Sequence, residues 1–178
     1  NRRKSPGVAL VKKIVEALIE LDLQRGGWVV KKLAGEKLLK DIFEVFEFPK
    51  GVSAKDFVEN IEGKIHVHEN LLSERIIYGY TIIDSLRAIL ELPGNEFIKI
   101  YGSTTDRALV FANVSMGRSP LVAIKVTPLR PAIVVLHNIT QVDEIGIKIA
   151  EKEGIPVVTT ILPLDEIKKR INGLLERA

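Results

Sequence analysis

Cysteine is absent from this chain of 178 residues, and histidine, methionine and tryptophan occur only three, one and one times. The lack of cysteine excludes a disulfide scaffold, a cysteine nucleophile and a thiolate metal site. No apolar run approaches the roughly 20 residues that a membrane-spanning helix needs. The N-terminus, residues 1–6, also lacks a signal-peptide pattern. We therefore expect a cytoplasmic protein with no membrane partner.

The composition that remains is globular, at 46% hydrophobic and 28% charged residues, and suits one large domain or two small ones. The net charge of +3 is unevenly spread. Residues 1–40 hold ten basic and four acidic residues, and the other 138 hold 16 basic and 19 acidic. A basic head on an acidic body is typical of a protein that meets a polyanion, although a solvated helix would give the same count. Scarce Gln beside abundant Ile, Glu and Lys favours a thermophilic source.

The N-terminal segment predicts two helices around a turn. Ser5-Pro6 is suited to begin a helix over Gly7–Asp22, in which apolar residues recur at helical spacing. Paired glycines then precede a β-prone run, Trp28–Lys32, and a second amphipathic helix is predicted over residues 33–46. Phe48-Pro49-Lys50-Gly51 breaks this pattern. We place the boundary there, between domains at residues 1–48 and 53–178.

From Ser53 onward, strand and helix patterns alternate. Strands are predicted at Lys64–Glu69, Arg75–Tyr80, Phe97–Tyr101, Ala108–Val114, Leu121–Thr127, Ala132–Leu136 and Ile155–Thr159, and helices at Ser53–Asn60, Asp84–Leu92, Gln141–Lys152 and Leu164–Arg177. The run Ala132–Leu136 has no polar alternation, so we expect it to be buried on both faces. The order predicts an α/β fold: a small mixed or parallel sheet with flanking helices.

The first 45 residues resemble the C-terminal half of a winged-helix DNA-binding domain. Gly7–Asp22 corresponds to the recognition helix, Leu23–Val30 to the wing, and Leu33–Leu39, which reads Leu-Ala-Gly-Glu-Lys-Leu-Leu, to the segment after the wing. Two further helices precede the recognition helix in such domains. About 40 further residues upstream of Asn1, with two helices and a polar turn, would strengthen this interpretation, and a chain that starts near Asn1 would weaken it. The alternative is a helical dimerisation arm.

If the resemblance holds, the basic head is the part that meets double-stranded DNA. A recognition helix presents its first residues to the major groove, while Lys and Arg neutralise phosphates. The candidate DNA-binding residues are Arg2, Arg3, Lys4 and Ser5 before the helix, Lys12 within it and Arg25 at the wing tip. Regulators that read two half-sites are usually two-fold dimers, so we expect a homodimer.

Residues 53–172 resemble the DRTGG domain, a small α/β module that accompanies regulatory domains. The shared features are Glu62-Gly63-Lys64-Ile65, the pair Asp106-Arg107, and an ending in which Ile149–Glu153 leads to Gly154–Thr160. Leu136-His137-Asn138 stands where the family has Thr-Gly-Gly, and we expect an additional hairpin at about Leu109–Thr127. The resemblance implies the α/β fold and a role in ligand sensing or assembly, but no particular ligand.

Two polar loops are candidates for a small anionic effector. Three hydroxyls, an acid and a guanidinium gather in Ser103, Thr104, Thr105, Asp106 and Arg107, and His137-Asn138 follows a buried strand. Loops at the carboxyl ends of strands are where ligands bind in α/β sheets. We expect both loops to line one pocket there, with Arg107 holding a phosphate or carboxylate. The alternative is a polar turn with an internal Asp106–Arg107 pair.

Other chemistry finds little support. His66 and His68 would share one strand face, but two ligands are too few for a structural zinc, so no metal is expected. Ser103, His137 and Asp143 could form a catalytic triad, but the sequence has no Gly-x-Ser-x-Gly nucleophile elbow to support one. The phosphate-binding motifs Gly-x-x-x-x-Gly-Lys and Gly-x-Gly-x-x-Gly do not occur, and no cofactor is expected.

We predict a transcriptional regulator. A regulatory or oligomerisation module without a DNA role is the alternative, and an enzyme comes third.

Overall fold

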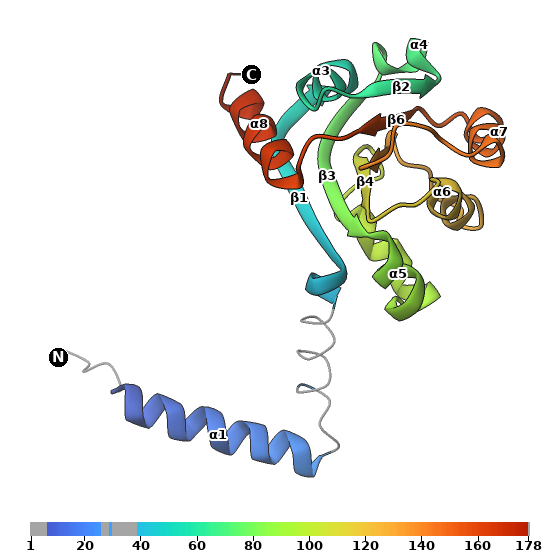
Figure 1. Cartoon of the computed structure of the whole chain (residues 1–178). Coiled ribbons are helices and arrows are strands. Elements are labelled where there is room, and N and C mark those ends of the chain that lie inside the picture. Colours follow the sequence, from blue (N-terminus) through green and yellow to red (C-terminus); the bar gives the residue numbers. More distant parts are fainter. Residues whose placement is uncertain (1–6, 26–28, 30–38, 178) are drawn as a thin grey trace. The chain divides into compact units, whose positions relative to one another are not determined.

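The structure, a computed structural model, describes residues 7–25, 29 and 39–177. The chain divides into two compact units, Asn1–Asp41 and Ile42–Ala178. The first contains α1 (Val8–Gln24), which confirms the predicted N-terminal helix. The second contains all the strands of the described part (Figure 1).

The second unit begins with strand β1 directly after a helical turn at residues 39–42. Its elements are β1 (Phe43–Ser53), α3 (Ala54–Asn60), β2 (Lys64–Val67), α4 (Glu69–Leu72), β3 (Ile76–Asp84), α5 (Ser85–Glu91), the 3₁₀ helix η1 (Gly94–Tyr101), β4 (Ala108–Ala112), α6 (Arg118–Lys125), β5 (Ile133–His137), α7 (Glu144–Glu153), β6 (Val157–Thr160) and α8 (Leu164–Arg177).

The six strands form one mixed sheet in the order β1-β3-β4-β5-β6-β2. The four central strands, β3 to β6, run parallel, and β1 and β2 pair antiparallel with β3 and β6 at the two edges. This arrangement confirms the predicted fold class, an α/β fold with a mixed sheet and flanking helices.

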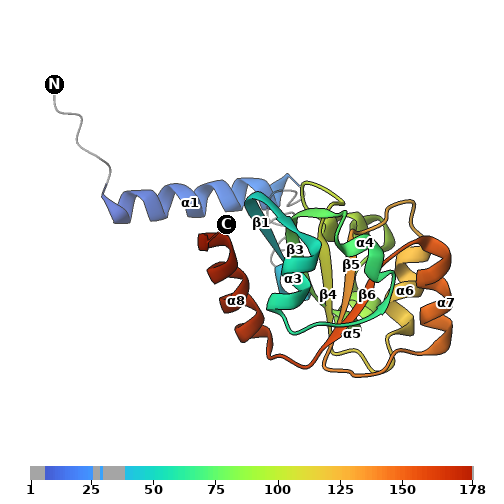
Figure 2. The ribbon, with the colours of Figure 1, turned by 90° about the horizontal axis from the view of Figure 1, so that it is seen from above.

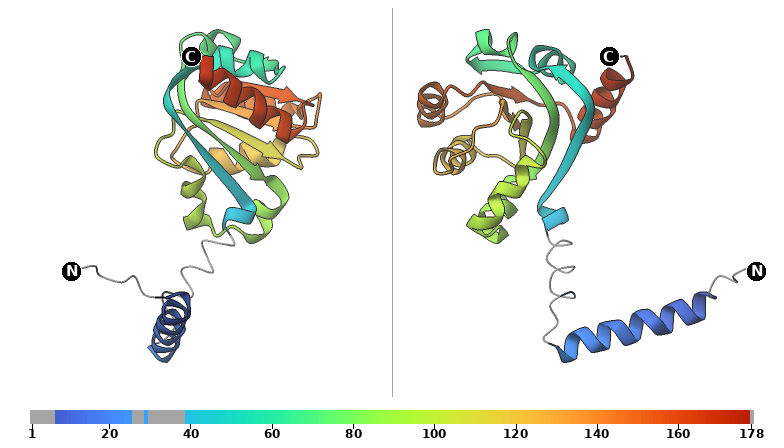
Figure 3. Two further views of the ribbon diagram at one scale, coloured as in Figure 1. Left: turned by 90° about the vertical axis from the view of Figure 1, so that its left-hand side faces the viewer. Right: turned by 180° about the vertical axis from the view of Figure 1, so that it is seen from behind.

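Helices cover both faces of the sheet. On one face, α3 and α8 pack against Ala108, Val110 and Val135; on the other, η1, α6 and α7 enclose Leu109 and Val134 (Figures 2 and 3). Successive residues of a strand point to opposite faces, so each central strand contributes to both cores. That is why Ala132–Leu136 reads as a continuous apolar run, and its residues are 7% exposed or less, as predicted.

The predicted helix over residues 33–46 is wrong at its C-terminal end. Residues 43–46 belong to β1, because Phe46 and Phe48 pack on Tyr80 of β3 with ring centroids 4.5 and 5.8 Å apart. The interruption at Pro49 is a register shift between Glu47 and Val52 inside this edge strand, a place where proline is tolerated. The boundary that we placed there falls within β1, and the chain divides after Asp41 instead.

Two further strand predictions are wrong. Phe97–Tyr101 belongs to η1, and most of Leu121–Thr127 belongs to α6. In α6 the buried residues Leu121 and Ile124 are three apart, the spacing of a helix face. Short alternating segments satisfy both periods, so the pattern alone did not distinguish them. The additional hairpin expected at about Leu109–Thr127 is therefore a strand followed by a helix.

Candidate functional site

The two loops predicted to form one pocket lie at opposite edges of the sheet. Ala108, the first residue of β4, pairs with Tyr80 and with Ile133, the first residue of β5. The loop of residues 103–107 precedes β4 and therefore lies at the amino edge of the parallel strands. His137, by contrast, ends β5 and pairs with Thr160 at the carboxyl edge. The single pocket is wrong, because the segment before β4 is a helix rather than the strand from which we inferred its position.

Arg107 is a buried structural residue with an exposed fraction of zero. Its Nη1 donates to Glu47 Oε1 at 3.2 Å and to the carbonyl of Tyr101, and its Nη2 donates to Glu47 Oε2 and to the Phe46 carbonyl, each at 3.0 Å. The Nε is buried without a partner among the described residues. The guanidinium thus fastens the amino-edge loop to β1, and we do not assign it to an effector.

The surroundings of Arg107 are shaped to hold it. A Cβ atom added at Gly79 or Gly102 would collide with the guanidinium, and Gly102 has a φ of +56°, which favours glycine. Burial raises the pKa of Glu47, but hydrogen bonds from the Ser103 amide and from Arg107, with the charge of Arg107, outweigh it and lower that pKa below 4.5. Glu47 therefore remains a carboxylate, which accepts hydrogen bonds from the Ser103 amide and from the Arg107 guanidinium.

A hollow at the amino edge, about 550 Å³ in volume, is bounded by charged side chains that are largely engaged elsewhere. Arg75 donates to the carbonyls of Ala132 at 2.7 Å and Gly154 at 2.8 Å. Burial lowers the pKa of Arg75, an effect that the charge of Asp106 opposes. The guanidinium connects the starts of β5 and β6, so its role here is structural.

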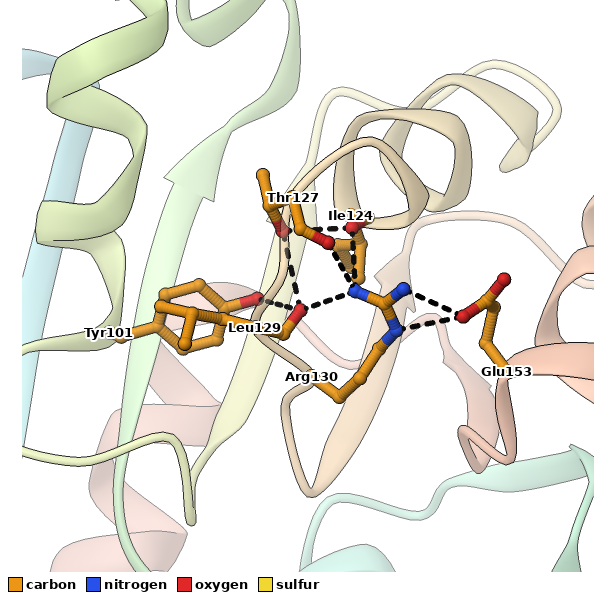
Figure 4. Close-up of polar contacts among 6 residues, drawn as sticks. All are labelled: Tyr101, Ile124, Thr127, Leu129, Arg130 and Glu153. Atoms are coloured by element: carbon orange, nitrogen blue, oxygen red, sulfur yellow. Dashed lines mark hydrogen bonds and ion pairs between the residues drawn. The ribbon is translucent and has the colours of Figure 1, made fainter.

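Arg130, which also lines this hollow, is engaged in the same way (Figure 4). Its Nε and Nη2 donate to Glu153 Oε2 at 2.9 and 2.7 Å, while Nη1 donates to the carbonyls of Ile124, Thr127 and Leu129. Tyr101 donates to the Leu129 carbonyl at 3.4 Å, and burial raises the pKa of its phenol to about 12. Arg130 joins the end of α6 to the end of α7, so few of its N–H groups are left to bind an anion.

At the carboxyl edge, His137 and Asn138 are also held by the backbone. His137 Nε2 donates to the Leu162 carbonyl at 2.9 Å, and the Asn138 amide donates to Thr160 at 2.8 Å. Asp143 caps α7 through the amide of Ile145. Ser103 lies across the sheet from His137, so the triad considered above does not assemble.

The paired histidines are likewise separated by the fold. His66 lies in β2 with Nε2 2.9 Å from Thr159 Oγ1, and burial, followed by the charge of Lys64, lowers its pKa. His68 follows the strand with a φ of +59° and donates to the Glu151 carbonyl. Over the described residues, no group of three His, Asp or Glu side chains is placed to hold a metal ion.

A second hollow, about 230 Å³ in volume, lies at the carboxyl ends of β3 and β4. Its walls are the start of α5 and the loop from Asn113 to Gly117 with the first turn of α6. The sequence pattern did not predict this hollow, because it favours a strand at residues 121–127 and makes the preceding loop part of a hairpin. The available signal was Ser-Met-Gly-Arg-Ser at residues 115–119 directly after a buried strand, the position of a strand-to-helix loop.

The predicted DNA-binding residues belong to the N-terminal unit. Arg2, Arg3, Lys4 and Ser5 lie outside the described residues. Lys12 projects from α1 with 76% of its side chain exposed, 3.8 Å from Glu16, and Arg25 follows the helix as an exposed residue. Most of the predicted wing and the segment after it also lie outside the described part, and Val29 within the wing has helical rather than extended backbone.

Comparison with known proteins identifies two archaeal relatives over nearly the whole chain. An uncharacterized HTH-type transcriptional regulator of Methanocaldococcus jannaschii is 44% identical over 180 residues, which cover 98% of this chain and 74% of the relative. One from Archaeoglobus fulgidus is 44% identical over 173 residues, which cover 95% and 74%. No protein-family model matches the chain.

Among solved structures, the regulatory region of Clostridium perfringens pyrophosphatase is similar to this chain. That structure contains CBS and DRTGG domains complexed with diadenosine tetraphosphate. The TM-score is 0.46 at 10% sequence identity, and the match covers 67% of this chain and 45% of that one. Within the described ranges of the present chain, none of the helices has the length and apolar character needed to cross a membrane.

Proposed function

The chain belongs to the family of HTH-type transcriptional regulators that its two archaeal relatives represent, and we propose that its two units divide this function. The N-terminal unit binds double-stranded DNA, and the α/β unit binds a small anionic effector. The observation that carries the proposal is the 44% identity, which extends over 98% of the chain. The protein acts as a homodimer in this proposal.

The charge distribution supports the assignment of DNA to the first unit. Residues 1–40 carry a net charge of +6, whereas the rest of the chain carries −3. DNA phosphates attract the basic residues 1–40 and repel the acidic remainder of the chain. The protein is therefore expected to bind a duplex through residues 1–40. Arg3 and Lys12 are the side chains chosen to test this.

The test is the salt dependence of binding to a mixed-sequence DNA duplex by the full-length protein. Each phosphate that a basic side chain neutralises contributes about 0.9 to the slope of log affinity against log salt concentration. Replacing Arg3 and Lys12 with alanine should therefore reduce that slope by up to about 2.

The matched control replaces two lysines of the α/β unit, Lys55 and Lys148, each of which is exposed and within 4 Å of a glutamate on its own helix. This variant loses the same charge and should retain the wild-type slope. If the full-length protein fails to retard a duplex in low salt, the DNA role is rejected and the non-DNA regulatory module replaces it.

A further inference from the structure

We propose that the hollow at the carboxyl ends of β3 and β4 is the effector site, and that it takes a phosphate monoester with a small apolar organic part. The phosphate binds at the first turn of α6. The hollow, about 230 Å³, lies between this turn and the start of α5, two helices that flank the same face of the sheet (Figure 1).

The first turn of α6 offers the amides of Arg118 and Ser119 as donors without a capping side chain, whereas Pro120, its third residue, has no N–H. Gly117 precedes the helix with a φ of +78°, and no side chain accepts a hydrogen bond from the turn. The first amides of any helix lack partners within it. With the helix dipole, they favour an anion at this end. Two other helices that follow parallel strands at this edge have side-chain caps, α5 from Asp84 and α7 from Asp143.

An independent observation on the facing wall also indicates a ligand. Ser85, the first residue of α5, is 6% exposed and lines the hollow. None of the hydrogen bonds found among the described residues engages its hydroxyl group. Its oxygen is not among the buried side-chain atoms that lack a partner, so the hydroxyl group is open to the hollow that Ser85 lines and can donate to an oxygen of a bound phosphate.

The side chains around the rim match a phosphate as well. Arg118, Ser115 and Ser119 are exposed and line the hollow, and a guanidinium binds a phosphate with two parallel hydrogen bonds. The two nearby carboxylates are engaged with other donors. Asp84 accepts from the Arg87 amide at 3.0 Å and from Asn113 at 2.9 Å, and Asp143 is the cap of α7.

A smaller adjoining hollow, about 110 Å³, indicates the organic part of the ligand. It shares Ser85, Ile89, Ser119 and Pro120 with the hollow of about 230 Å³. Its other walls are apolar, from Ala88, Phe97, Phe111 and Ala123. A phosphate at α6 would direct an apolar or aromatic group toward these side chains, where burial removes it from water.

Phenyl phosphate is the probe, since it joins a phosphate monoester to an aromatic ring. We expect saturable binding by calorimetry, with amide shifts in residues 85–89 and 113–119 in an NMR titration. Phenol, which lacks the phosphate, should not bind, and inorganic phosphate should bind more weakly than the ester. The role of this site as an effector site rests on the proposed function, whereas the binding itself does not.

Two variants test the residues. Arg118→Gln should weaken binding of phenyl phosphate roughly tenfold or more, as expected for loss of a charge-assisted hydrogen bond. Ser85→Ala should weaken it by about three- to tenfold. Lys125→Gln removes the same charge from the exposed C-terminal end of α6 and should leave the affinity unchanged. Thermal unfolding of each variant checks that the fold is retained.

The proposal is overturned if phenyl phosphate shows no saturable binding up to about 10 mM, or if Arg118→Gln binds it as the wild type does. Amide shifts confined to another part of the sheet would overturn it too. Binding that follows the predicted variant pattern supports the site even if DNA affinity does not change. In that case the effector role in the proposed function is the part that fails.

Discussion

Arg107 illustrates how a residue's chemistry is decided by its surroundings. A guanidinium beside hydroxyls and an acid is typical of an anion site, and the sequence offered it as an anchor for the effector. In the structure, Arg107 is fully buried, and its two terminal nitrogens donate hydrogen bonds to Glu47 and to two backbone carbonyls. A buried charge needs such partners. The pairing partner is 60 residues away in sequence, so the spacing of residues gave no indication of it.

The Glu47–Arg107 pair predicts a pH-dependent contribution to stability. Glu47→Gln should lower the free energy of unfolding at pH 7 by about 1–3 kcal/mol, less than for a fully buried pair because the Glu47 side chain is 44% exposed. The folded-state pKa of Glu47 is depressed. Its contribution is therefore full above the unfolded-state value near 4.5 and is lost as the pH falls through the folded-state value.

Urea unfolding of the wild type and of Glu47→Gln between pH 3 and pH 7 measures this contribution. The difference between the two proteins should shrink steadily below about pH 4.5. Glu59→Gln is the control, because Glu59 is 63% exposed and 3.9 Å from Lys55. It should change stability little at any pH. A difference for Glu47→Gln that stays constant with pH would show that its charge is not what stabilises the loop.

At the scale of the element, α1 carries an apolar stripe of the kind that associates with another helix. Val11, Ile14, Leu18 and Leu21 follow the alternating spacing of three and four residues of a coiled-coil seam. Each of these side chains is between 44% and 61% exposed. The stripe fits the expected homodimer, in which a second copy of α1 would cover it.

We predict that Ile14→Lys together with Leu18→Lys converts a dimer into a monomer, because two charges in the seam would have to be desolvated. Light scattering at micromolar concentration measures the mass. The control pair, Ala9→Lys with Glu20→Gln, adds the same charge on the opposite side of the helix and should leave the mass unchanged. A wild-type protein that is monomeric under these conditions would contradict the expected assembly.

Two of the elements that were predicted incorrectly share one physical cause. A segment of five to eight residues satisfies a period of 2 and a period of 3.6 about equally, as Phe97–Tyr101 and Leu121–Thr127 do. The longest helix of the sheet-containing unit, α8, was predicted well, and its 14 residues match the predicted Leu164–Arg177. For β1, the sequence Phe-Glu-Val-Phe became a strand because its aromatic side chains pack on Tyr80 of a neighbouring strand.

At the scale of the whole molecule, the position of β1 sets the minimal folding unit. The second compact unit begins at Ile42, and β1 contributes Phe48 and Val52 to the core beneath α3 and α8. A fragment of residues 42–178 should therefore unfold cooperatively. A fragment of residues 53–178, cut at the boundary suggested by sequence, lacks these side chains and Glu47.

Circular dichroism during heating compares the two fragments. Truncating a single buried phenylalanine costs about 3–5 kcal/mol, and a whole domain has only about 5–15. The shorter fragment should therefore show a greatly lowered transition or none. Equal transition temperatures would mean that β1 is dispensable and that the boundary lies at Phe48–Gly51.

The sequence by itself determined the features that depend on local order. The apolar run of β5, the helices ended by Gly154 and Pro93, the α/β alternation and the contrast between a basic head and an acidic body were all readable, because each is set by neighbouring residues. It also indicated a transcriptional regulator through the resemblances at Gly7–Leu39 and at residues 53–172.

Only the tertiary structure decided which loops meet. Whether a loop lies at the amino or the carboxyl edge depends on the type and direction of the element before it, so one misassigned helix moved residues 103–107 to the wrong edge. Pairings across the sheet, such as that of Arg107 with Glu47, and the hollow between α5 and α6 exist because distant segments pack together. A carboxyl-edge hollow with Ser85 on one wall and Arg118 on the other could not be predicted from spacing, since its two walls are separated by the whole of η1 and β4.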